Sequence, residues 1–209
     1  MAGAIEIVDW GRIAYADAWR RQRDLVDQRA NGEIPDRLIL CEHDPVITAG
    51  RRTPAAAIGR LPFPLHEIER GGELTYHGPG QLVGYPILDL RPRGSGLHRY
   101  LRDLEEVLVR ALARFGLDGR RNPPHTGVWV GARKIASIGV AVKRWVSYHG
   151  FALNVTTDLQ AFASFQPCGL APAVMTSFAA LGVPTDVEAV KPIVSASFAE
   201  VFEVALADL

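Results

Sequence analysis

The 209-residue chain has no excess charge of either sign, because 23 lysines and arginines balance 23 aspartates and glutamates. This balance argues against the large basic surface that binding to nucleic acid or to an anionic membrane requires. No apolar run approaches the ~20 residues of a membrane-spanning helix. Residues 1–6 also lack the basic start and apolar stretch of a secretory signal. We therefore expect neither a nucleic-acid partner nor a membrane partner.

Cysteine is scarce, and the only two, Cys41 and Cys168, cannot build a disulfide framework. Neither belongs to a CxxC pair and the six histidines are scattered, so no structural metal site is expected. The phosphate-binding patterns GxxxxGK[ST] and GxGxxG are missing as well. These absences predict a protein without a metal or another cofactor. Two cysteines and no signal also predict a reducing, cytoplasmic setting.

Nearly half of the residues (48%) are hydrophobic, which is enough for a sizeable core in a chain of this length. Apolar periodicity and turn residues predict helices over residues 13–30, 97–115 and 193–206. They predict strands over residues 5–8, 37–41, 45–48, 81–90, 127–130, 134–142 and 151–155. Helices and hairpins are interspersed without a regular βαβ alternation. We therefore predict one α+β domain over residues 1–209, with helices packed on a mixed sheet.

Residues 49–64 are rich in Gly, Pro, Ala and Arg and have no clear period, so they are predicted to be a loop. Long irregular segments are often binding loops or lids. Cys41 lies in the apolar strand 37–41, where a free cysteine acts as a small apolar filler.

Cys168 lies between a proline and a glycine in the run FQPCGL, on a stiff turn rather than inside a packed helix. Such a turn suits a thiol that is exposed and aimed at a substrate. A thiol becomes a strong nucleophile when a neighbouring positive charge or base favours the thiolate. The candidates for this neighbour are Lys134, His77 and His149. The alternative is that Cys168 is an inert, buried cysteine, which is the commoner case.

Residues 70–81, RGGELTYHGPGQ, contain four glycines and a proline, which fix an irregular backbone. Glycine lets a ligand approach the main chain closely. The alternative is a simple hairpin connection, but this usually needs only about two to five residues. We therefore favour a ligand-binding loop, because functional groups concentrate on loops held by rigid elements.

Two further stretches carry candidate residues. Lys134, in GARKIASIGV, begins a strand of small and apolar residues, where partial desolvation would suit a base or a charge that stabilises a thiolate. The simpler alternative is a lysine at a strand edge that points to water. Ser137 and Gly139 in the same stretch offer a hydroxyl and backbone amides. His149, before the glycine in SYHGFALNV, is either a proton carrier or only a turn residue.

Together these stretches resemble one family. The segments RGGELTYHGPGQ, GVWVGARKIASIGV, SYHGFALNV and FQPCGL occur in the order and spacing of the octanoyltransferases of lipoate biosynthesis. These lipoyl(octanoyl) transferases are related in fold to biotin and lipoate protein ligases. The resemblance covers about residues 34–182. It implies an α+β catalytic domain of the biotin/lipoate ligase type.

The resemblance also implies the reaction. An octanoyl group would pass from octanoyl-acyl carrier protein to Cys168 as a thioester, and then to a lysine ε-amine. The acceptors would be lipoyl domains of 2-oxoacid dehydrogenase complexes and the glycine cleavage H protein. Lys134 matches the family lysine that activates the thiol and handles protons. The positions that match the family's substrate-lining residues are Arg70, Gly71, Gly72, Glu73, Leu74, Thr75, Tyr76, His77, Ser137, Ile138, Gly139, Gly150, Phe151 and Ala152.

The implied chemistry needs no ATP, because thioester exchange is nearly isoenergetic and conversion of a thioester to an amide is downhill. Three other functions stay open. The first is an ATP-dependent lipoate or biotin ligase of the same fold, which would need no essential cysteine. The second is a cysteine hydrolase that uses Cys168 with His77 or His149. The third is a module that binds lipoyl domains without catalysis.

Overall fold

The computed structural model of the chain describes residues 4–92, 94, 96–165 and 170–207. Cys168 therefore lies outside the described residues.

Most strands belong to one eight-stranded sheet of mixed direction. In spatial order they are β11 (Ala205–Ala207), β1 (Ala4–Ile13), β2 (Asp36–His43), β6 (Gln81–Ile87), β10 (Val146–Asn154), β9 (Arg133–Lys143), β8 (His125–Val130) and β7 (Gly119–Asn122). The first three run parallel, and every later pair is antiparallel. A smaller mixed sheet has the order β4 (Leu65–Glu67), β3 (Val46–Ala49) and β5 (Leu74–His77).

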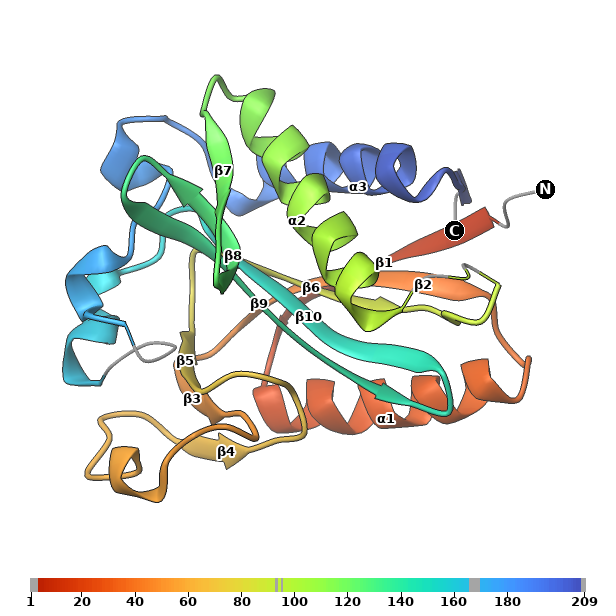
Figure 1. Cartoon of the computed structure of the whole chain (residues 1–209), viewed down its shortest axis with the longest axis horizontal. Helices are drawn as coiled ribbons and strands as arrows, with labels where there is room; N and C mark the ends of the chain where they lie inside the picture. The colour runs from red at the N-terminus through yellow and green to blue at the C-terminus, as the bar shows by residue number, and fades with distance from the viewer. Residues whose placement is uncertain (1–3, 93, 95, 166–169, 208–209) are drawn as a thin grey trace.

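Three α-helices cover the large sheet. They are α1 (Tyr15–Ala30), α2 (Leu97–Ala113) and α3 (Val187–Phe202). In Figure 1, α2 and α3 lie together on one side of the sheet and α1 runs along the other side. The short 3₁₀ helices are η1 (Ala55–Ala57), η2 (Leu159–Ser164), η4 (Pro172–Val174) and η5 (Ala179–Leu181). None of the described helices is both long and apolar enough to cross a membrane.

The centre of the core is the pair β6 and β10, in which every residue is buried. Burial of every residue is typical of strands that are covered on both faces. Phe151 and Leu153 pack into the apolar cluster shared with α2 and α3, whereas Val83 and Tyr85 belong to the cluster under α1. Gly84 pairs with Phe151, and a Cβ on Gly84 would lie 2.1 Å from the phenyl ring. Glycine is thus needed at position 84 so that the Phe151 ring can lie across β6.

The predicted fold class, an α+β arrangement with helices on a mixed sheet, is confirmed. Helix α2 carries its apolar stripe into the core as predicted, and Cys41 is fully buried there. Residues 50–64 are irregular apart from η1, as predicted, whereas Ala49 is the last residue of β3.

The helix predicted over residues 193–206 is wrong in both bounds. Helix α3 begins at Val187, where the carboxylate of Asp186 accepts a hydrogen bond from the Ala189 N–H at 2.8 Å. Pro192 lies inside the helix, although proline favours the first turn of a helix. The prediction therefore began the helix after Pro192. The residues after α3 form β11, which pairs with β1.

The stretch 70–81 is only partly a loop. Residues 74–77 form β5, which pairs with β3, and irregular backbone is confined to the residues before and after it. Residues 74–77 are extended because they pair with β3, and the glycines on either side of them gave no signal for a strand.

Candidate active site

A hollow with about 450 Å³ of space, part of it open to solvent, lies between the start of α1, the segment before β5 and the middle of β6, β9 and β10. Eleven of the fourteen residues that the sequence assigned to substrate binding line it. They are Arg70, Gly71, Gly72, Thr75, His77, Ser137, Ile138, Gly139, Gly150, Phe151 and Ala152. The other lining residues are Tyr15, Val83, Tyr85 and His149. Segments far apart in the sequence therefore meet at one hollow.

Three of the fourteen residues, Glu73, Leu74 and Tyr76, are not among the described residues that line the hollow. Leu74 and Tyr76 pack instead into a separate apolar cluster of the small sheet. This cluster also contains Phe162, Phe165 and Met175. Leu74 and Tyr76 thus belong to one cluster with residues that precede and follow 166–169, and the Tyr76 ring packs on Phe162 with centroids 5.5 Å apart.

Arg70 fixes the wall of the hollow that precedes β5. It is 6% exposed, and its Nη2 donates to the Thr48 carbonyl at 2.8 Å and to the Thr48 hydroxyl at 2.9 Å. The Gly71 N–H donates to the Val140 carbonyl at 3.0 Å. A Cβ on Gly139 would lie 2.9 Å from the Gly71 oxygen, so glycine allows the wall to pack directly on β9.

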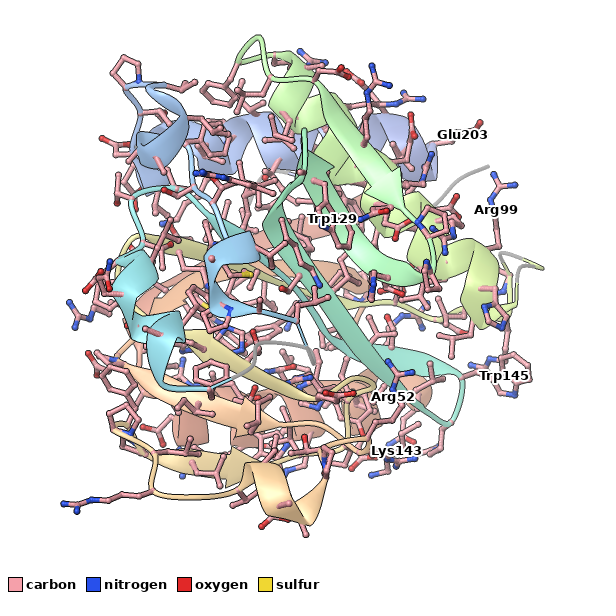
Figure 2. The ribbon with its side chains drawn as sticks, turned by 60° about the vertical axis from the view of Figure 1, so that its left-hand side comes forward. Arg52, Arg99, Trp129, Lys143, Trp145 and Glu203 are labelled. Carbon is pink, nitrogen blue, oxygen red and sulfur yellow. The ribbon has the colours of Figure 1, made fainter. Side chains whose placement is uncertain are left out.

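The irregular segment after β3 lies against this wall. The Arg51 N–H donates to the Arg70 carbonyl and the Arg52 N–H donates to the Gly72 carbonyl, each at 3.0 Å. Arg52 is labelled in Figure 2, where its side chain extends at the surface. The suggestion that residues 49–64 act as a lid stays a prediction.

His77 presents one defined nitrogen to the hollow. Its Nδ1 lies 2.8 Å from Oε1 of Gln81, and the Gln81 amide nitrogen donates to Asn154 and to the Tyr76 carbonyl. The Gln81 oxygen is therefore an acceptor, His77 Nδ1 is the donor, and Nε2 keeps the lone pair. Burial lowers the pKa of His77 to about 3, so the ring is neutral at pH 7.

His43 lies behind His77 and is held in one tautomer. Its Nδ1 donates to the Ile13 carbonyl at 2.8 Å, and its Nε2 accepts from the Tyr85 hydroxyl at 2.7 Å. Burial lowers the pKa of His43 to about 4. Tyr15 completes the group, because its ring stacks on His77 with centroids 5.9 Å apart. This end of the hollow is polar, and the charge of Arg70 in its wall also acts to lower the pKa of His77.

His149 lies inside β10, so the turn interpretation is wrong. It pairs with Val140 and has a φ of +55°, which is unusual for a residue other than glycine. Its Nε2 lies 3.4 Å from a carboxylate oxygen of Glu69, which also accepts from the Trp19 indole at 3.0 Å. The hydrogen bond from His149 holds the pKa of Glu69 down at about 2, whereas burial lowers the pKa of His149.

Lys134 is buried in β9 at 2% exposure, so the alternative of a lysine that points to water is wrong. Its Nζ lies 4.9 Å from the centre of the ring of Trp129, which Figure 2 shows inside the molecule. A Cβ on Gly127 would lie 2.8 Å from Cε of Lys134, so glycine leaves room for the lysine. The buried Glu105 holds Gly127 by accepting its N–H at 3.0 Å.

Met175 and Thr176, which follow Cys168 in the chain, pair with the strand of Lys134. The Thr176 N–H donates to the Lys134 carbonyl at 2.9 Å, and Met175 forms a parallel bridge with Lys134. Lys134 is not among the described residues that line the hollow.

The site therefore offers a partly apolar slot lined by two histidines whose pKa burial lowers, His77 and His149. A buried lysine, Lys134, lies beside residues 175 and 176. Within the described ranges, no three His, Cys, Asp or Glu side chains gather as metal ligands. The catalytic roles of Cys168 and Lys134 stay predictions.

Two buried histidines, His43 and His77, predict a loss of stability in mild acid, and the buried His149, whose pKa burial also lowers, adds to it in the same direction. Unfolded histidine titrates near pH 6.5, whereas the folded pKa values are about 4 for His43 and about 3 for His77. The unfolded chain therefore binds more protons below pH 6.5, and the stabilisation present above that pH is lost as pH falls. Between pH 7.5 and 5 we expect the free energy of unfolding to fall by about 2 kcal/mol for each histidine.

Urea denaturation at pH 7.5, 6 and 5 measures this loss. The window ends above the range in which Glu69 titrates. His77→Gln should remove part of the pH dependence, and Ser195→Ala, which changes no titratable group, should leave it unchanged. Equal stability at pH 7.5 and 5 would contradict the neutral, buried state of both rings.

Comparison with known proteins gives the family. Residues 14–199 match the lipoyl protein ligase A/B catalytic domain. An octanoyltransferase of Gloeobacter violaceus is 49% identical over 97% of this chain and 92% of its own length. That of Synechococcus elongatus is 46% identical over 98% and 90%. That of Rubrobacter xylanophilus is 52% identical over 77% and 76%.

Solved structures share the fold. A lipoate-protein ligase A bound with ATP has a TM-score of 0.74 at 16% identity and covers 100% of this chain and 89% of its own. The biotin protein ligase of Aquifex aeolicus has a TM-score of 0.55 at 10% identity, over 95% and 69%. Sequence identities this low support a common fold and nothing more specific. With the family match and the close relatives, they lead to one assignment: the chain belongs to the lipoyl protein ligase A/B catalytic domain family and, within it, to the octanoyltransferases, which are acyltransferases.

Proposed function

We propose that the protein transfers an octanoyl group from octanoyl-acyl carrier protein to the ε-amine of a lysine on a lipoyl domain. The acceptors are the lipoyl domains of 2-oxoacid dehydrogenase complexes and the glycine cleavage H protein. The observation that carries this proposal is the match to octanoyltransferases over nearly the whole chain. We assign the reaction to the cytoplasm, because a reducing compartment keeps a nucleophilic thiol free.

In the proposed mechanism Cys168 is the nucleophile and Lys134 handles protons. The Cys168 thiolate attacks the thioester carbonyl, a new C–S bond forms, and the carrier thiol leaves with a proton. The lysine amine of the acceptor then attacks the acyl-enzyme, a C–N bond forms, and the bond to Cys168 breaks as the thiol regains a proton. Covalent catalysis thereby divides one transfer into two easier steps.

The burial of Lys134 supports its assigned role, because a cation in a low-dielectric site acts more strongly on a neighbouring thiol than one in water. The hydrogen bond from the Thr176 N–H to the Lys134 carbonyl also supports this role, because Thr176 lies only eight residues after Cys168.

The hollow is the proposed site for the acyl chain. Its apolar lining comes from Val83, Ile138, Phe151 and Ala152. At ~0.8 kcal/mol for each buried CH₂, the six interior methylenes of an octanoyl chain contribute roughly 5 kcal/mol at most. Such a contribution would favour octanoyl over shorter acyl groups.

The test is to incubate the protein with octanoyl-carrier protein and a lipoyl domain, without ATP. We expect an octanoyl amide on the acceptor lysine, detected by mass spectrometry of the lipoyl domain. A lipoyl domain with arginine at that position is the control and should stay unmodified. Free octanoate as the main product would indicate a hydrolase, and a strict need for ATP would indicate a ligase.

A further inference from the structure

A buried hydrogen-bond network joins the hollow to the strand of Lys134. It begins at His77, whose Nδ1 donates to Gln81, and continues from the Gln81 amide nitrogen to Oδ1 of Asn154 at 2.9 Å. Gln81, Asn154 and Thr176 are 2%, 1% and 0% exposed. Water therefore cannot replace these bonds without opening the core.

Asn154 occupies the central position of this network. Its Nδ2 donates to the Thr176 carbonyl at 2.9 Å, and the Thr176 N–H donates to the Lys134 carbonyl at 2.9 Å. The peptide groups on both sides of Thr176 are therefore fixed, one by Asn154 and one by Lys134. The Phe178 N–H adds a bond to the Asn154 carbonyl at 3.2 Å.

Among the described residues just before this point, only Val174 packs on the core, at the margin of the apolar cluster of the small sheet. Residues 170–174 are exposed or half-buried, and their regular structure is the three-residue helix η4. Met175 and Thr176 are the first buried residues after Cys168 among those described. Thr176 is therefore the point at which the described chain after Cys168 is fixed to the core by side-chain and backbone hydrogen bonds.

We propose that Asn154 is a positioning residue that holds Met175 and Thr176, which follow Cys168 in the chain, against the strand of Lys134, with Gln81 orienting the Asn154 amide. The inference rests on the proposed function, in which Cys168 carries the acyl group. An amide suits this place because it accepts from Gln81 and donates to Thr176 at the same time. Neither a carboxylate nor an alkyl group does both.

Asn154→Asp tests the role with little change in shape. The new carboxylate still accepts from Gln81, but it places a second acceptor against the Thr176 carbonyl. We expect amide hydrogen exchange in the peptide covering residues 170–176 to be at least about 10-fold faster at pH 8, because the local opening becomes easier. Formation of the acyl-enzyme should slow by about 10- to 100-fold, as a small misplacement of a reacting group costs that much.

The pH dependence of hydrogen exchange in Asn154→Asp distinguishes a lost positioning bond from general damage to the fold. Burial raises the pKa of a carboxyl group, and the protonated acid donates to the Thr176 carbonyl as the amide does. Protection of residues 170–176 in Asn154→Asp, corrected for intrinsic exchange rates, should therefore recover from pH 8 to pH 6. Asn154→Leu has no donor and should not recover. Ser195→Ala, which removes one buried hydrogen bond from α3, should leave this peptide unchanged.

Unchanged exchange in both Asn154 variants would overturn the proposal whatever Cys168 does. Faster exchange with a wild-type rate of acyl-enzyme formation would also overturn it, because the segment would then be held without consequence for the chemistry. If Cys168→Ser still transfers the octanoyl group while exchange behaves as expected, Asn154 still positions the segment and the proposed function fails instead.

Discussion

Replacing Cys168 with serine is expected to lower octanoyl transfer to a lipoyl domain by about 10⁴-fold or more, a loss typical of removing a covalent nucleophile. A hydroxyl is not ionised by a neighbouring ammonium at neutral pH, whereas a thiol is, so the acyl-enzyme should not form. Intact-protein mass spectrometry after incubation with octanoyl-carrier protein measures this directly. The wild type should gain one octanoyl group on the Cys168 peptide, and the variant should gain none.

Cys41 provides the matched control. It is fully buried, its Sγ lies 3.6 Å from Nε2 of His43, and burial raises the pKa of its thiol. A thiol of this kind is inert toward substrates and reagents. Cys41→Ala should therefore form the acyl-enzyme at a near-normal rate. An octanoyl group found on Cys168→Ser, or transfer that persists in that variant, would reject Cys168 as the carrier of the acyl group.

The central strands of the fold were predictable from the sequence because burial on both faces leaves a plain signature. The centres of β2 and β6 are mostly apolar, and α2 shows three- and four-residue spacing. The polar residues Ser147 and His149 hid the first half of β10, which was predicted only over residues 151–155. Strands β4 and β7 gave no such pattern, since most of their residues are partly or fully exposed. Their conformation depends on pairing with β3 and β8.

The hollow was predictable where residues lie in unusual stretches and unpredictable elsewhere. Tyr15 comes from the first turn of α1 and Tyr85 from the middle of a buried strand, and neither position differs locally from ordinary core. His149 resembled a turn residue because a glycine follows it, yet cross-strand pairing keeps it in β10. Gly127 and Trp129 lie in a predicted strand, but their contact with Lys134 arises only when β8 and β9 pair, so the sequence gave no sign of that contact.

Lys134→Met is expected to reduce transfer by about 10²- to 10⁴-fold, the usual contribution of a group that moves protons. Methionine has a similar length and no charge, so it fills the space that Gly127 leaves beside the lysine. Without the ammonium, the thiolate of Cys168 loses its nearest proposed source of stabilisation. The midpoint of its alkylation by iodoacetamide should then move up toward the ~8.5 of a free cysteine.

Two controls distinguish loss of the ammonium from damage to the fold: the free energy of unfolding of Lys134→Met, and the same substitution at a second lysine. Among the described residues Lys134 makes no ion pair, so methionine leaves no carboxylate unpaired there, and the free energy of unfolding should change little. Lys143 lies near the tip of the β9–β10 hairpin (Figure 2), half exposed and paired with Asp27. Lys143→Met should keep the wild-type alkylation midpoint and transfer rate. If the midpoint is the same in Lys134→Met and in the wild type, the ammonium does not activate the thiol, and its burial beside Trp129 serves packing alone.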